Sequence, residues 1–430
     1  MKALPADFCE RMKRLLGGAY PDFLSSYALA PARGLRVNTH KLSCARFCEI
    51  SPWEIEPLPY LEEGFLLKTE DAALGTHPYH LAGLFYVQEP SAMAPVAALG
   101  LREGMRVLDL CAAPGGKSTA IAARIGSAGL LVANEIVPNR ARVLLQNVQR
   151  MGLTNTLVAN MQPDTLCARL EGEFEAVLVD APCSGEGMFR KDDTALCEWS
   201  AEHVRACAPR QRAILESAAR ALCPGGRLVY STCTFSREEN EETVEAFLRA
   251  QPSFALLEEK RLYPHNSLGE GQFYAVLQKA GEKALKRGDE APAKTDKRLR
   301  AARDTLAALF PALDTRRMRL LPDGRVILPP GEIPEGLHLL MAGLELGELR
   351  KERFEPAHAL FQSLGAQCEN RLSFAPGDAA LAAYLRGETI PAQGASGSTA
   401  VCVDGYPLGF GKAVDGVLKN HFPKGLRRIR

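Results

Sequence analysis

The chain has 430 residues, 46% of them apolar and 24% charged, so it is long enough for two or three domains with a sizeable buried core. Its formal net charge of +1 excludes a protein that binds nucleic acid through overall basicity, so any such surface must be a local patch. No apolar run reaches the roughly 20 residues that a membrane span needs, and we expect a cytoplasmic protein without a membrane partner.

Twelve cysteines are spread along the chain without the dense spacing of a disulfide-bonded module, so we expect reduced thiols. His40, Cys44 and Cys48 lie close together, but no second cluster completes a set of four ligands, and we expect no metal site. Four of the cysteines are expected to fill the core: Cys167, Cys197, Cys207 and Cys223.

Residues 1–100 mix short helices with loops marked by Pro and Gly, which predicts a small accessory domain. Over residues 101–283, apolar strands alternate with amphipathic helices, a pattern typical of a parallel sheet covered on both faces. The expected strands are Met105–Leu110, Leu130–Asn134, Thr156–Ala159, Ala176–Asp180, Arg227–Ser231 and Gln272–Gln278. The expected helices are Lys117–Arg124, Pro138–Met151, Val204–Leu222 and one that opens with a capping box at Ser236 and Glu239 and runs to about Ala250. These elements predict a doubly wound α/β domain with ligands at the carboxyl ends of its strands.

The rest of the chain is less regular. Residues 284–300 are rich in charge and predict an exposed linker. Residues 301–430 predict a smaller module that mixes α and β structure, with Arg319–Leu328 and Thr399–Val414 as its strand-rich stretches.

Residues 111–117, between the first strand and the next helix, have the composition of a cofactor loop. Small residues stand where the backbone must bend sharply and approach a ligand. The next strand ends at Glu135, about 20 residues on, where an acid can bind the two hydroxyls of a ribose. A phosphate-binding loop is the alternative, but that motif needs a glycine where this chain has Cys111. Asp109 either holds the loop by hydrogen bonds or contacts the ligand.

Two cysteines follow strands of the predicted sheet. Cys183 comes after the strand that ends at Asp180, and Cys233 after the strand that ends at Ser231, so both thiols are expected at the ligand-binding edge. A thiol becomes a useful nucleophile at neutral pH only when its pKa is lowered, and the expected helix start at Ser236 is a candidate activator of Cys233. A thiolate that adds to carbon 6 of a cytosine makes carbon 5 able to attack a sulfonium methyl group. The base must then leave any stack, which single-stranded RNA makes easier.

Three motifs in this order resemble the Nop/Sun family of RNA 5-methylcytosine methyltransferases: CAAPGGK at 111–117, DAPCSGEG at 180–187 and STCT at 231–234. The segments Leu35–Thr39 and Tyr86–Met93 are also similar to this family. Residues 187–192 and the long C-terminal region resemble its bacterial RsmF branch, which modifies small-subunit ribosomal RNA.

The resemblance implies a Rossmann-like S-adenosylmethionine-dependent methyltransferase domain in which Cys233 bonds covalently to the base. Cys183 would assist release of the product, and Asp180 would face both the cytosine and the cofactor. The residues implied to contact S-adenosylmethionine are Cys111, Ala112, Ala113, Pro114, Gly115, Gly116, Lys117, Glu135, Arg140, Gln162 and Asp180. The chain departs from the family at residues 160–162, where an acid that holds adenine is common and Asn-Met-Gln stands instead. Lys191 is expected either to contact RNA or to be a solvated surface charge.

The C-terminal tail resembles a PUA-like RNA-binding module. Its basic residues, set against Asp415, are Lys412, Lys419, Lys424, Arg427, Arg428 and Arg430. Such a cluster can neutralise phosphates and position RNA without reading its sequence, although a solvated face is the alternative. Ribosomal RNA, in particular 16S rRNA or the small subunit, is the expected substrate, with transfer RNA as the alternative. A nucleotidase with a phosphate-binding loop and a non-catalytic RNA-binding protein are the alternatives of other classes, and the oligomeric state cannot be read from the sequence.

Overall fold

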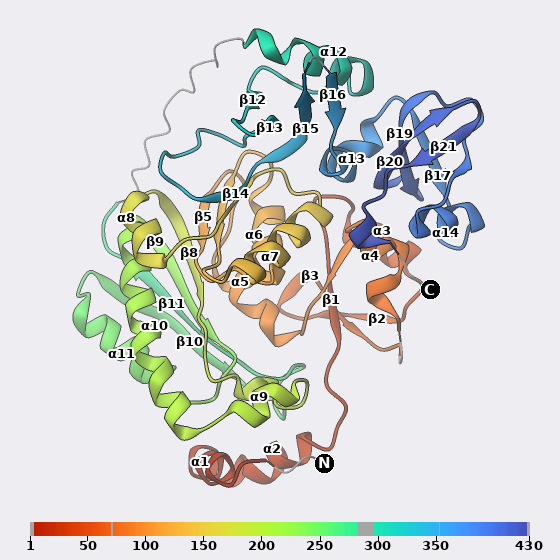
Figure 1. Ribbon diagram of the computed structural model, residues 1–430. Helices are drawn as coiled ribbons and strands as arrows, with labels where there is room; N and C mark the ends of the chain where they lie inside the picture. The colour runs from red at the N-terminus through yellow and green to blue at the C-terminus, as the bar shows by residue number, and fades with distance from the viewer. Residues whose placement is uncertain (1–3, 70–71, 283–295, 352, 428–430) are drawn as a thin grey trace.

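The computed structural model describes residues 4–69, 72–282, 296–351 and 353–427. The expected linker as far as residue 295, and the basic residues Arg428 and Arg430, lie outside this part. Figure 1 shows a large central sheet between helices, with a smaller N-terminal sheet beside it and two further small sheets in the C-terminal region. No described helix is both long and apolar enough to span a membrane.

The central sheet has eight strands in the order β10-β11-β9-β8-β5-β6-β7-β14. Five of them run parallel: β5 (Arg106–Asp109), β6 (Leu130–Asn134), β7 (Thr156–Ala159), β8 (Phe174–Asp180) and β9 (Leu222–Thr232). Their nearly continuous burial explains why they read as unbroken apolar runs. The strand order reverses between β5 and β8, the place where doubly wound sheets bind ligands, which confirms the predicted fold class.

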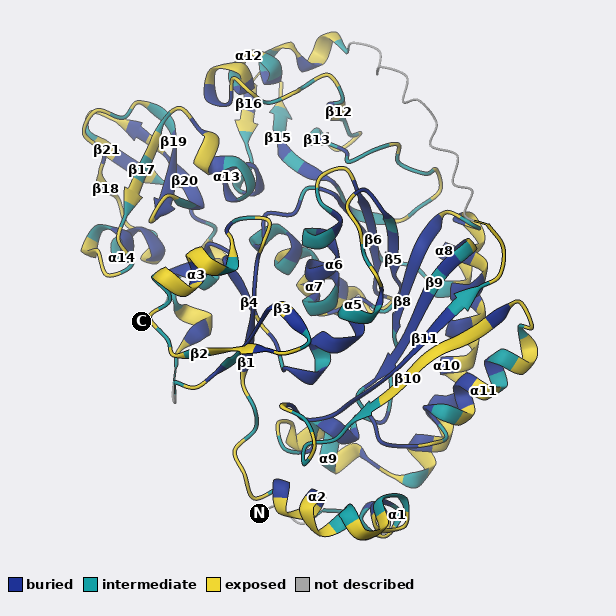
Figure 2. Ribbon diagram, turned by 180° about the vertical axis from the view of Figure 1, so that it is seen from behind, coloured by how far each residue is buried: buried dark blue, intermediate teal, exposed yellow. Residues whose placement is uncertain are grey.

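Helices cover both faces of this sheet (Figure 2). One layer is α5 (Ala94–Ala98), α6 (Gly116–Ile125) and α7 (Pro138–Arg150); the other is α8 (Pro163–Arg169), α10 (Ala201–Ala221) and α11 (Glu241–Ala250). Ile121 and Leu144 pack in the first core, and Leu166 and Ile214 in the second, all nearly inaccessible to solvent. Full burial of such a side chain contributes about 1.5–3 kcal/mol, so these two layers fix the frame that positions the loops at the sheet edge.

The predicted helix start at Ser236 is wrong, because α11 begins at Glu241. Ser236 accepts only a long hydrogen bond, 3.3 Å, from the backbone N–H of Glu239. The Glu239 carboxylate does not return to residue 236 but accepts hydrogen bonds from Ser184 and Gln211, so the capping box is incomplete. Residues 237–240 form a turn instead.

Three edge features differ from the sequence prediction. The antiparallel hairpin of β10 (Phe254–Leu262) and β11 (Gln272–Lys279) extends the sheet beyond β9, and the sequence pattern misses β10 because its exposed side chains do not alternate with apolar ones. At the opposite edge β14 (Leu339–Ala342), from the C-terminal region, pairs antiparallel with β7. Finally, β9 already begins at Leu222 and includes the Pro-Gly-Gly stretch that is expected to separate it from the preceding helix.

The N-terminal region forms a four-stranded sheet in the order β2-β3-β1-β4. Its strands are β1 (Gly34–Val37), β2 (Ile55–Leu58), β3 (Leu61–Leu67) and β4 (Phe85–Val87), and its helices are α1 (Ala6–Leu16), α2 (Tyr20–Ser26), α3 (Cys44–Ile50) and α4 (Pro78–Leu81). Phe8 and Phe23, on α1 and α2, pack with three aromatic residues near the loops after β8 and β9: Phe189, Trp199 and Phe235. The short α9 (Asp193–Glu198) lies in sequence between the first two of these three residues.

The C-terminal region carries two further sheets, in the orders β12-β13-β15-β16 and β17-β19-β20-β21-β18. The first has β12 (Arg319–Leu320), β13 (Arg325–Leu328), β15 (Leu344–Arg350) and β16 (Arg353–Pro356), with α12 (Arg300–Leu309) and α13 (His358–Leu364) beside it. The second has β17 (Arg371–Phe374), β18 (Ile390–Pro391), β19 (Gly397–Val403), β20 (Tyr406–Val414) and β21 (Val417–Asn420), with α14 (Ala379–Arg386). Both stretches predicted to be rich in strands are confirmed.

Candidate active site

The predicted cofactor loop, residues 111–117, connects β5 to α6 at the point where the strand order reverses. Gly115 has a φ of 112°, which side chains rarely tolerate, and an added Cβ would lie 3.2 Å from the Leu144 side chain. At Gly116 an added Cβ would lie 3.2 Å from the Gln88 side chain. Gly115 is therefore required by its backbone conformation, whereas a side chain at Gly116 would need the Gln88 side chain to shift.

Arg36, on β1 of the N-terminal sheet, holds this loop from behind. Its fully buried guanidinium donates to the carbonyl of Gly116 at 3.0 Å and to the Thr119 hydroxyl at 2.7 Å. A longer bond, 3.3 Å, joins it to Gln88. Burial lowers the pKa of Arg36 to about 10, so the side chain still carries its charge at neutral pH. The N-terminal region thus fixes the first turn of α6, a role that the sequence prediction missed.

Asp109 lies beneath the same loop, at the end of β5. Its Oδ2 accepts a hydrogen bond of 2.7 Å from Ser118, while Oδ1 has no hydrogen-bond partner among the described residues. Burial raises the pKa of Asp109 to about 7. The bond to Ser118 favours the first of the two predicted alternatives, in which Asp109 holds the loop.

Glu135 and Gln162 follow the next two strands, and Arg140 lies in the first turn of α7. The buried Glu135 carboxylate accepts the backbone N–H of Val137 at 2.9 Å and lies 3.5 Å from the Arg140 guanidinium. Arg140 also donates to the carbonyl of Ala113 at 3.0 Å, so it ties the cofactor loop to the acid. Gln162 is exposed at the start of α8 and caps no backbone N–H there, and its role stays a prediction.

Asp180, the last residue of β8, is the centre of a polar cluster. Its Oδ2 forms an ion pair of 2.7 Å with Lys117 of the cofactor loop, and its Oδ1 accepts hydrogen bonds from Ser231 at 2.7 Å and Gln272 at 3.4 Å. Burial alone would lower the pKa of Lys117, but the charge of Asp180 and the hydrogen bond to it raise the pKa above its ordinary value. The lysine is therefore a fixed cation held by an aspartate.

Cys183 and Cys233 face each other across the loops that follow β8 and β9. Their sulfur atoms are 3.4 Å apart, and both side chains are partly exposed. The hydrogen bond to Cys233, together with burial, raises the pKa of Cys183 well above its ordinary value, so Cys183 is a thiol at neutral pH. A thiolate at Cys233 is among the charges that raise the pKa of Lys117, which puts that ammonium within electrostatic reach of the sulfur.

The comparisons with known proteins agree with this geometry. Residues 96–278 match the family described as 16S rRNA methyltransferase RsmB/F, and residues 4–90 match the N-terminal domain of 16S rRNA methyltransferase RsmF. Residues 307–364 match the first C-terminal domain of RsmF, and residues 371–428 match its PUA domain. A ribosomal RNA small subunit methyltransferase F from Vibrio vulnificus is 35% identical over 99% of this chain and 98% of its own length. The chain belongs to the RsmB/F family of methyltransferases.

Further relatives support the same assignment. A protein of that name from Erwinia tasmaniensis is 35% identical over 99% of this chain and 97% of its own length, and one from Escherichia coli is 44% identical over 55% and 52%. A methyltransferase homologue from Pyrococcus horikoshii has a TM-score of 0.57 and 29% identity over 63% of this chain and 94% of its own. NSun6 from the same organism, solved with SFG, shares the fold, with a TM-score of 0.58 and 24% identity over 65% of this chain and 99% of its own.

The residues present fit S-adenosylmethionine, the cofactor of this family. Four of the seven residues of the cofactor loop are Ala or Gly, so little side-chain bulk stands between a ligand and its backbone. Glu135 offers a carboxylate suited to ribose hydroxyls, and Asp180 with Lys117 offers a charge pair suited to the amino and carboxylate groups of the methionine part. A phosphate-binding loop is disfavoured for a separate reason, because its motif needs a glycine where this chain has Cys111.

Several supporting residues could not be found from local spacing. The fully buried Glu239 accepts the backbone N–H of Ser184 at 2.9 Å and the Gln211 amide at 2.8 Å, so it fixes the loop that carries Cys183. Glu186 accepts the backbone N–H of Phe235 and the Trp199 indole N–H, both at 2.9 Å, and joins the two cysteine loops. Their partners are 13 to 55 residues away in sequence, so no motif spacing reports them.

Other predicted positions have simpler surroundings. Burial raises the pKa of Cys111 well above its ordinary value, so this cysteine lines the loop as a thiol. The expectation that Cys197 fills the core is wrong, because it is exposed on the short α9. Lys191 is exposed and its contact with RNA stays a prediction. No group of three or more potential metal ligands occurs among the described residues.

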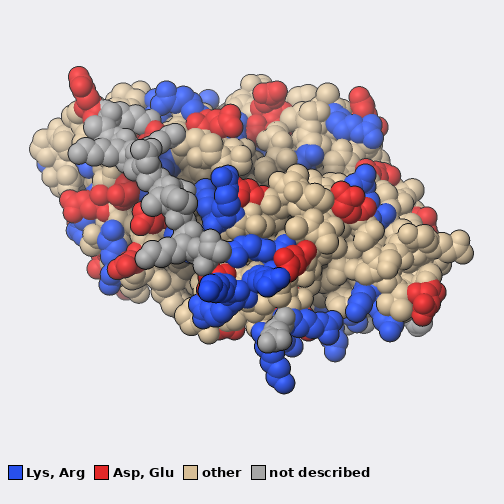
Figure 3. Space-filling model, turned by 90° about the horizontal axis from the view of Figure 1, so that it is seen from above, with Lys and Arg blue, Asp and Glu red and all other residues tan. Residues whose placement is uncertain are grey.

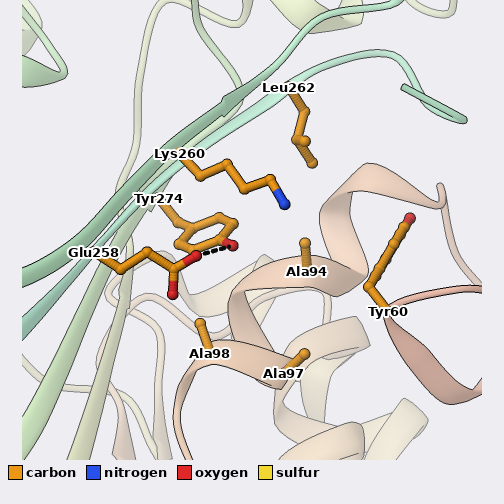
Figure 4. A pocket seen from close by; sticks show the side chains of 8 residues that line it. All are labelled: Tyr60, Ala94, Ala97, Ala98, Glu258, Lys260, Leu262 and Tyr274. Atoms are coloured by element: carbon orange, nitrogen blue, oxygen red, sulfur yellow. Dashed lines mark hydrogen bonds between the residues drawn. The ribbon is translucent and has the colours of Figure 1, made fainter. Parts of the chain in front are cut away.

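A separate small pocket lies between the N-terminal sheet, α5 and the β10–β11 hairpin (Figure 4). Ala94, Ala97 and Ala98 form its floor, and Tyr274 donates a hydrogen bond of 2.9 Å to Glu258 on its wall. Its volume is about 220 Å³, below the roughly 300 Å³ at which ligand pockets begin. None of the predicted site residues lines it.

Proposed function

We propose that this chain transfers a methyl group from S-adenosylmethionine to carbon 5 of a cytosine in small-subunit ribosomal RNA, with Cys233 as the nucleophile. The observation that carries the proposal is the pair of sulfur atoms 3.4 Å apart, beside Asp180, at the ends of adjacent parallel strands. The names of full-length relatives support ribosomal RNA of the small subunit as the substrate. The proposal includes a cytoplasmic location, where bacterial ribosomes are assembled.

The chemistry depends on making carbon 5 nucleophilic. S-adenosylmethionine, when bound, supplies an electrophilic methyl group. The Cys233 thiolate forms a bond to carbon 6, which moves the electrons of the ring double bond toward carbon 5 and lets that carbon accept the methyl group. Loss of the carbon 5 proton to water then returns electrons to the ring, and the bond between sulfur and carbon 6 breaks to restore the thiolate.

Asp180 and Lys117 have the surroundings needed to orient the base during these steps. The Asp180 carboxylate is held at both oxygens, by Lys117 on one and Ser231 on the other, so its direction is fixed before a ligand arrives. Oδ1 accepts from both Ser231 and Gln272, but among the described residues Oδ2 accepts only from Lys117, which leaves a lone pair for the amino group of a cytosine. A fixed carboxylate costs little reorganisation when the substrate binds.

Cys183 serves the release step in this proposal. Because its pKa lies well above the ordinary value, it keeps its proton and can donate a hydrogen bond to the sulfur of Cys233. A donor at this position stabilises the thiolate that forms as Cys233 leaves carbon 6. Without it, attack and methyl transfer would still proceed, but the covalent complex would persist.

Local basic surfaces support RNA binding by the C-terminal region. Lys412 and Lys419 are exposed, directly opposed on β20 and β21, so their charges add on one face of the PUA-like sheet. Near the linker, residues 296–319 carry seven basic and three acidic residues, an excess of four positive charges in a chain whose net charge is +1. Figure 3 shows Lys and Arg side chains gathered over part of the upper face. Such patches bind phosphates without reading sequence.

The test is to compare 5-methylcytosine in 16S rRNA and transfer RNA from cells with and without the gene, by bisulfite sequencing. We expect at least one cytosine of 16S rRNA to lose its methyl group, and to regain it when purified protein and S-adenosylmethionine are added to the unmodified small subunit. Loss confined to transfer RNA would assign the alternative substrate. Unchanged methylation in both RNAs would contradict the proposed function.

A further inference from the structure

β14 brings a residue of the C-terminal region to the cofactor edge of the central sheet. This strand pairs antiparallel with β7, with Leu339 opposite Ala159, the last residue of β7. His338 therefore lies just beyond the end of β7, next to Asn160. The backbone N–H of Asn160 donates to the carbonyl of His338 at 3.1 Å, and the His338 ring nitrogen Nδ1 lies 3.2 Å from the carbonyl oxygen of Asn160.

Asn160 connects this corner to the end of β6. Its side-chain amide donates to the carbonyl of Glu135 at 2.6 Å and to that of Ile136 at 3.0 Å. The apolar side chains of Ile136 and Val137 are 45% and 41% exposed at the same rim, so a planar apolar ligand would find a surface there. Glu135, Asn160 and His338 thus form one continuous rim along the ends of β6, β7 and β14.

This rim has no carboxylate at residues 160–162, where the related family commonly has an acid that holds adenine. Residues 160–162 contain no acid, and the amide nitrogen of Asn160 already donates to two backbone carbonyls. The amino group of an adenine is a donor and needs an acceptor. The side chain that lies beside Asn160 is the imidazole of His338, which has two nitrogen atoms. Only a nitrogen without a proton can accept a hydrogen bond from the adenine.

The neighbouring carbonyl fixes the tautomer of His338. A carbonyl oxygen only accepts hydrogen bonds, so the Nδ1 atom beside Asn160 must carry the proton. In the neutral imidazole this leaves Nε2 as the acceptor. The ring is exposed, and its one hydrogen bond to the described residues is that of Nδ1.

We propose that His338 is a cofactor-binding residue whose Nε2 accepts a hydrogen bond from the exocyclic amine of the adenine. The inference rests on the use of S-adenosylmethionine in the proposed function and not on the choice of cytosine or of ribosomal RNA. It makes the cofactor site composite, since the residue just before β14, in the C-terminal region, supplies the acceptor that the loop after β7 lacks.

The test uses two ligands, S-adenosylhomocysteine and S-inosylhomocysteine, in which a carbonyl replaces the exocyclic amine and the ring nitrogen N1 carries a proton. Binding to the full-length protein is measured by isothermal titration calorimetry. We expect the wild-type protein to prefer the adenosyl ligand by roughly three- to tenfold, the range of one net hydrogen bond. His338→Phe keeps a ring but no acceptor, and His338→Ala removes both, so both variants should lose this preference.

Two comparisons separate the acceptor from a structural role. His338→Gln keeps an acceptor and should restore part of the preference, whereas His203→Phe, on α10 across the sheet, should match the wild-type protein. The backbone pairing of β14 with β7 does not need the ring, so thermal unfolding of all variants should be close to that of the wild type. The proposal would be overturned if His338→Phe kept the wild-type preference for the adenosyl ligand. Loss of that preference in Gln162→Ala, with His338→Phe unchanged, would overturn it in the same way. Binding of neither ligand to the folded wild-type protein would overturn the cofactor assignment itself.

Discussion

Asp109 is the buried carboxyl group behind the cofactor loop, and its raised pKa has a measurable consequence. The folded-state pKa of about 7 lies above the ordinary value of 3.8, because burial disfavours the charged form. The unfolded chain therefore loses this proton first as the pH rises from about 4. Over the window from pH 4 to 7 this group makes the folded state progressively less stable, and above pH 7 the loss is complete.

Asp109→Asn should remove this pH dependence while it keeps an acceptor for Ser118. The difference in free energy of unfolding, variant minus wild type, should increase by a few kcal/mol between pH 4 and pH 7, since each pKa unit corresponds to about 1.4 kcal/mol. Urea unfolding of both proteins at a series of pH values measures the difference. A constant difference across this window would show that Asp109 is ionised in the folded protein throughout.

Residues of the site that follow strands could be predicted from the sequence, because the carboxyl ends of parallel strands meet at one edge. Cys183, Cys233 and the cofactor loop meet there as expected. Arg36 and Glu239 could not be predicted, because each reaches the site from a distant segment and nothing in the local pattern records its partner. The spacing of Ser236 and Glu239 even predicts a helix cap, because the sequence alone does not distinguish the glutamate of a capping box from a buried carboxylate with distant partners.

At the scale of elements, helix α1 supports both cysteine loops through one ion pair. Arg11 donates to the fully buried Glu186, whose other donors are Trp199 and the backbone of Phe235, two residues beyond Cys233. Arg11→Ala would leave a buried carboxylate without its cation. We expect a loss of about 1–3 kcal/mol of stability and a lower kcat with little change in affinity for S-adenosylmethionine.

Matched variants test this role of α1. Arg14→Ala removes an exposed charge from the same helix and should leave stability and kcat close to those of the wild type. Arg11→Ala combined with Glu186→Gln should recover part of the lost stability, because the neutral amide no longer buries an unpaired charge. Chemical unfolding and single-turnover methyl transfer measure the two effects. Equal losses in Arg11→Ala and Arg14→Ala would contradict the role of the ion pair.

The elements of the central sheet are predicted well where burial on both faces makes a strand apolar throughout, as in β6 and β7. Prediction fails at the two edges. β10 is exposed over most of its length and has four consecutive charged residues, so it lacks the apolar signal, and the four residues of β14 lie about 180 residues after β7 in the sequence. Edge strands depend on a partner that a local pattern does not contain.

At the scale of the whole molecule, we expect the separate regions to act on one RNA, and the exposed lysines of the PUA-like sheet provide a test. Replacing Lys412 and Lys419 by alanine should weaken binding of the small ribosomal subunit. It should also lower the slope of log affinity against log salt by roughly 0.7–0.9 for each phosphate that the variant no longer neutralises. Arg212→Ala with Arg220→Ala, on the outer face of α10, removes the same charge elsewhere. If both double variants weaken binding of the small subunit equally, Lys412 and Lys419 belong to a solvated face and not to an RNA-binding surface.

The division of the chain at residues 100, 283 and 300 stays a prediction. Such boundaries are hard to predict from the sequence, because residues of the N-terminal and C-terminal regions both contact the central domain. Arg36 of the N-terminal region holds the cofactor loop, and β14 of the C-terminal region completes the central sheet. A local composition change marks a loop, but it does not tell which region a later strand will join.

The most direct measurement of the central claim is the covalent complex between the protein and its RNA. Cys183→Ala, incubated with S-adenosylmethionine and unmodified 16S rRNA, should accumulate a protein–RNA adduct that survives denaturing electrophoresis, because Cys233 still attacks but release is slowed. The double variant Cys183→Ala, Cys233→Ala should form no adduct and no 5-methylcytosine. An adduct that persists in the double variant, or methyl transfer by Cys233→Ala at the wild-type rate, would contradict the assignment of Cys233 as the nucleophile.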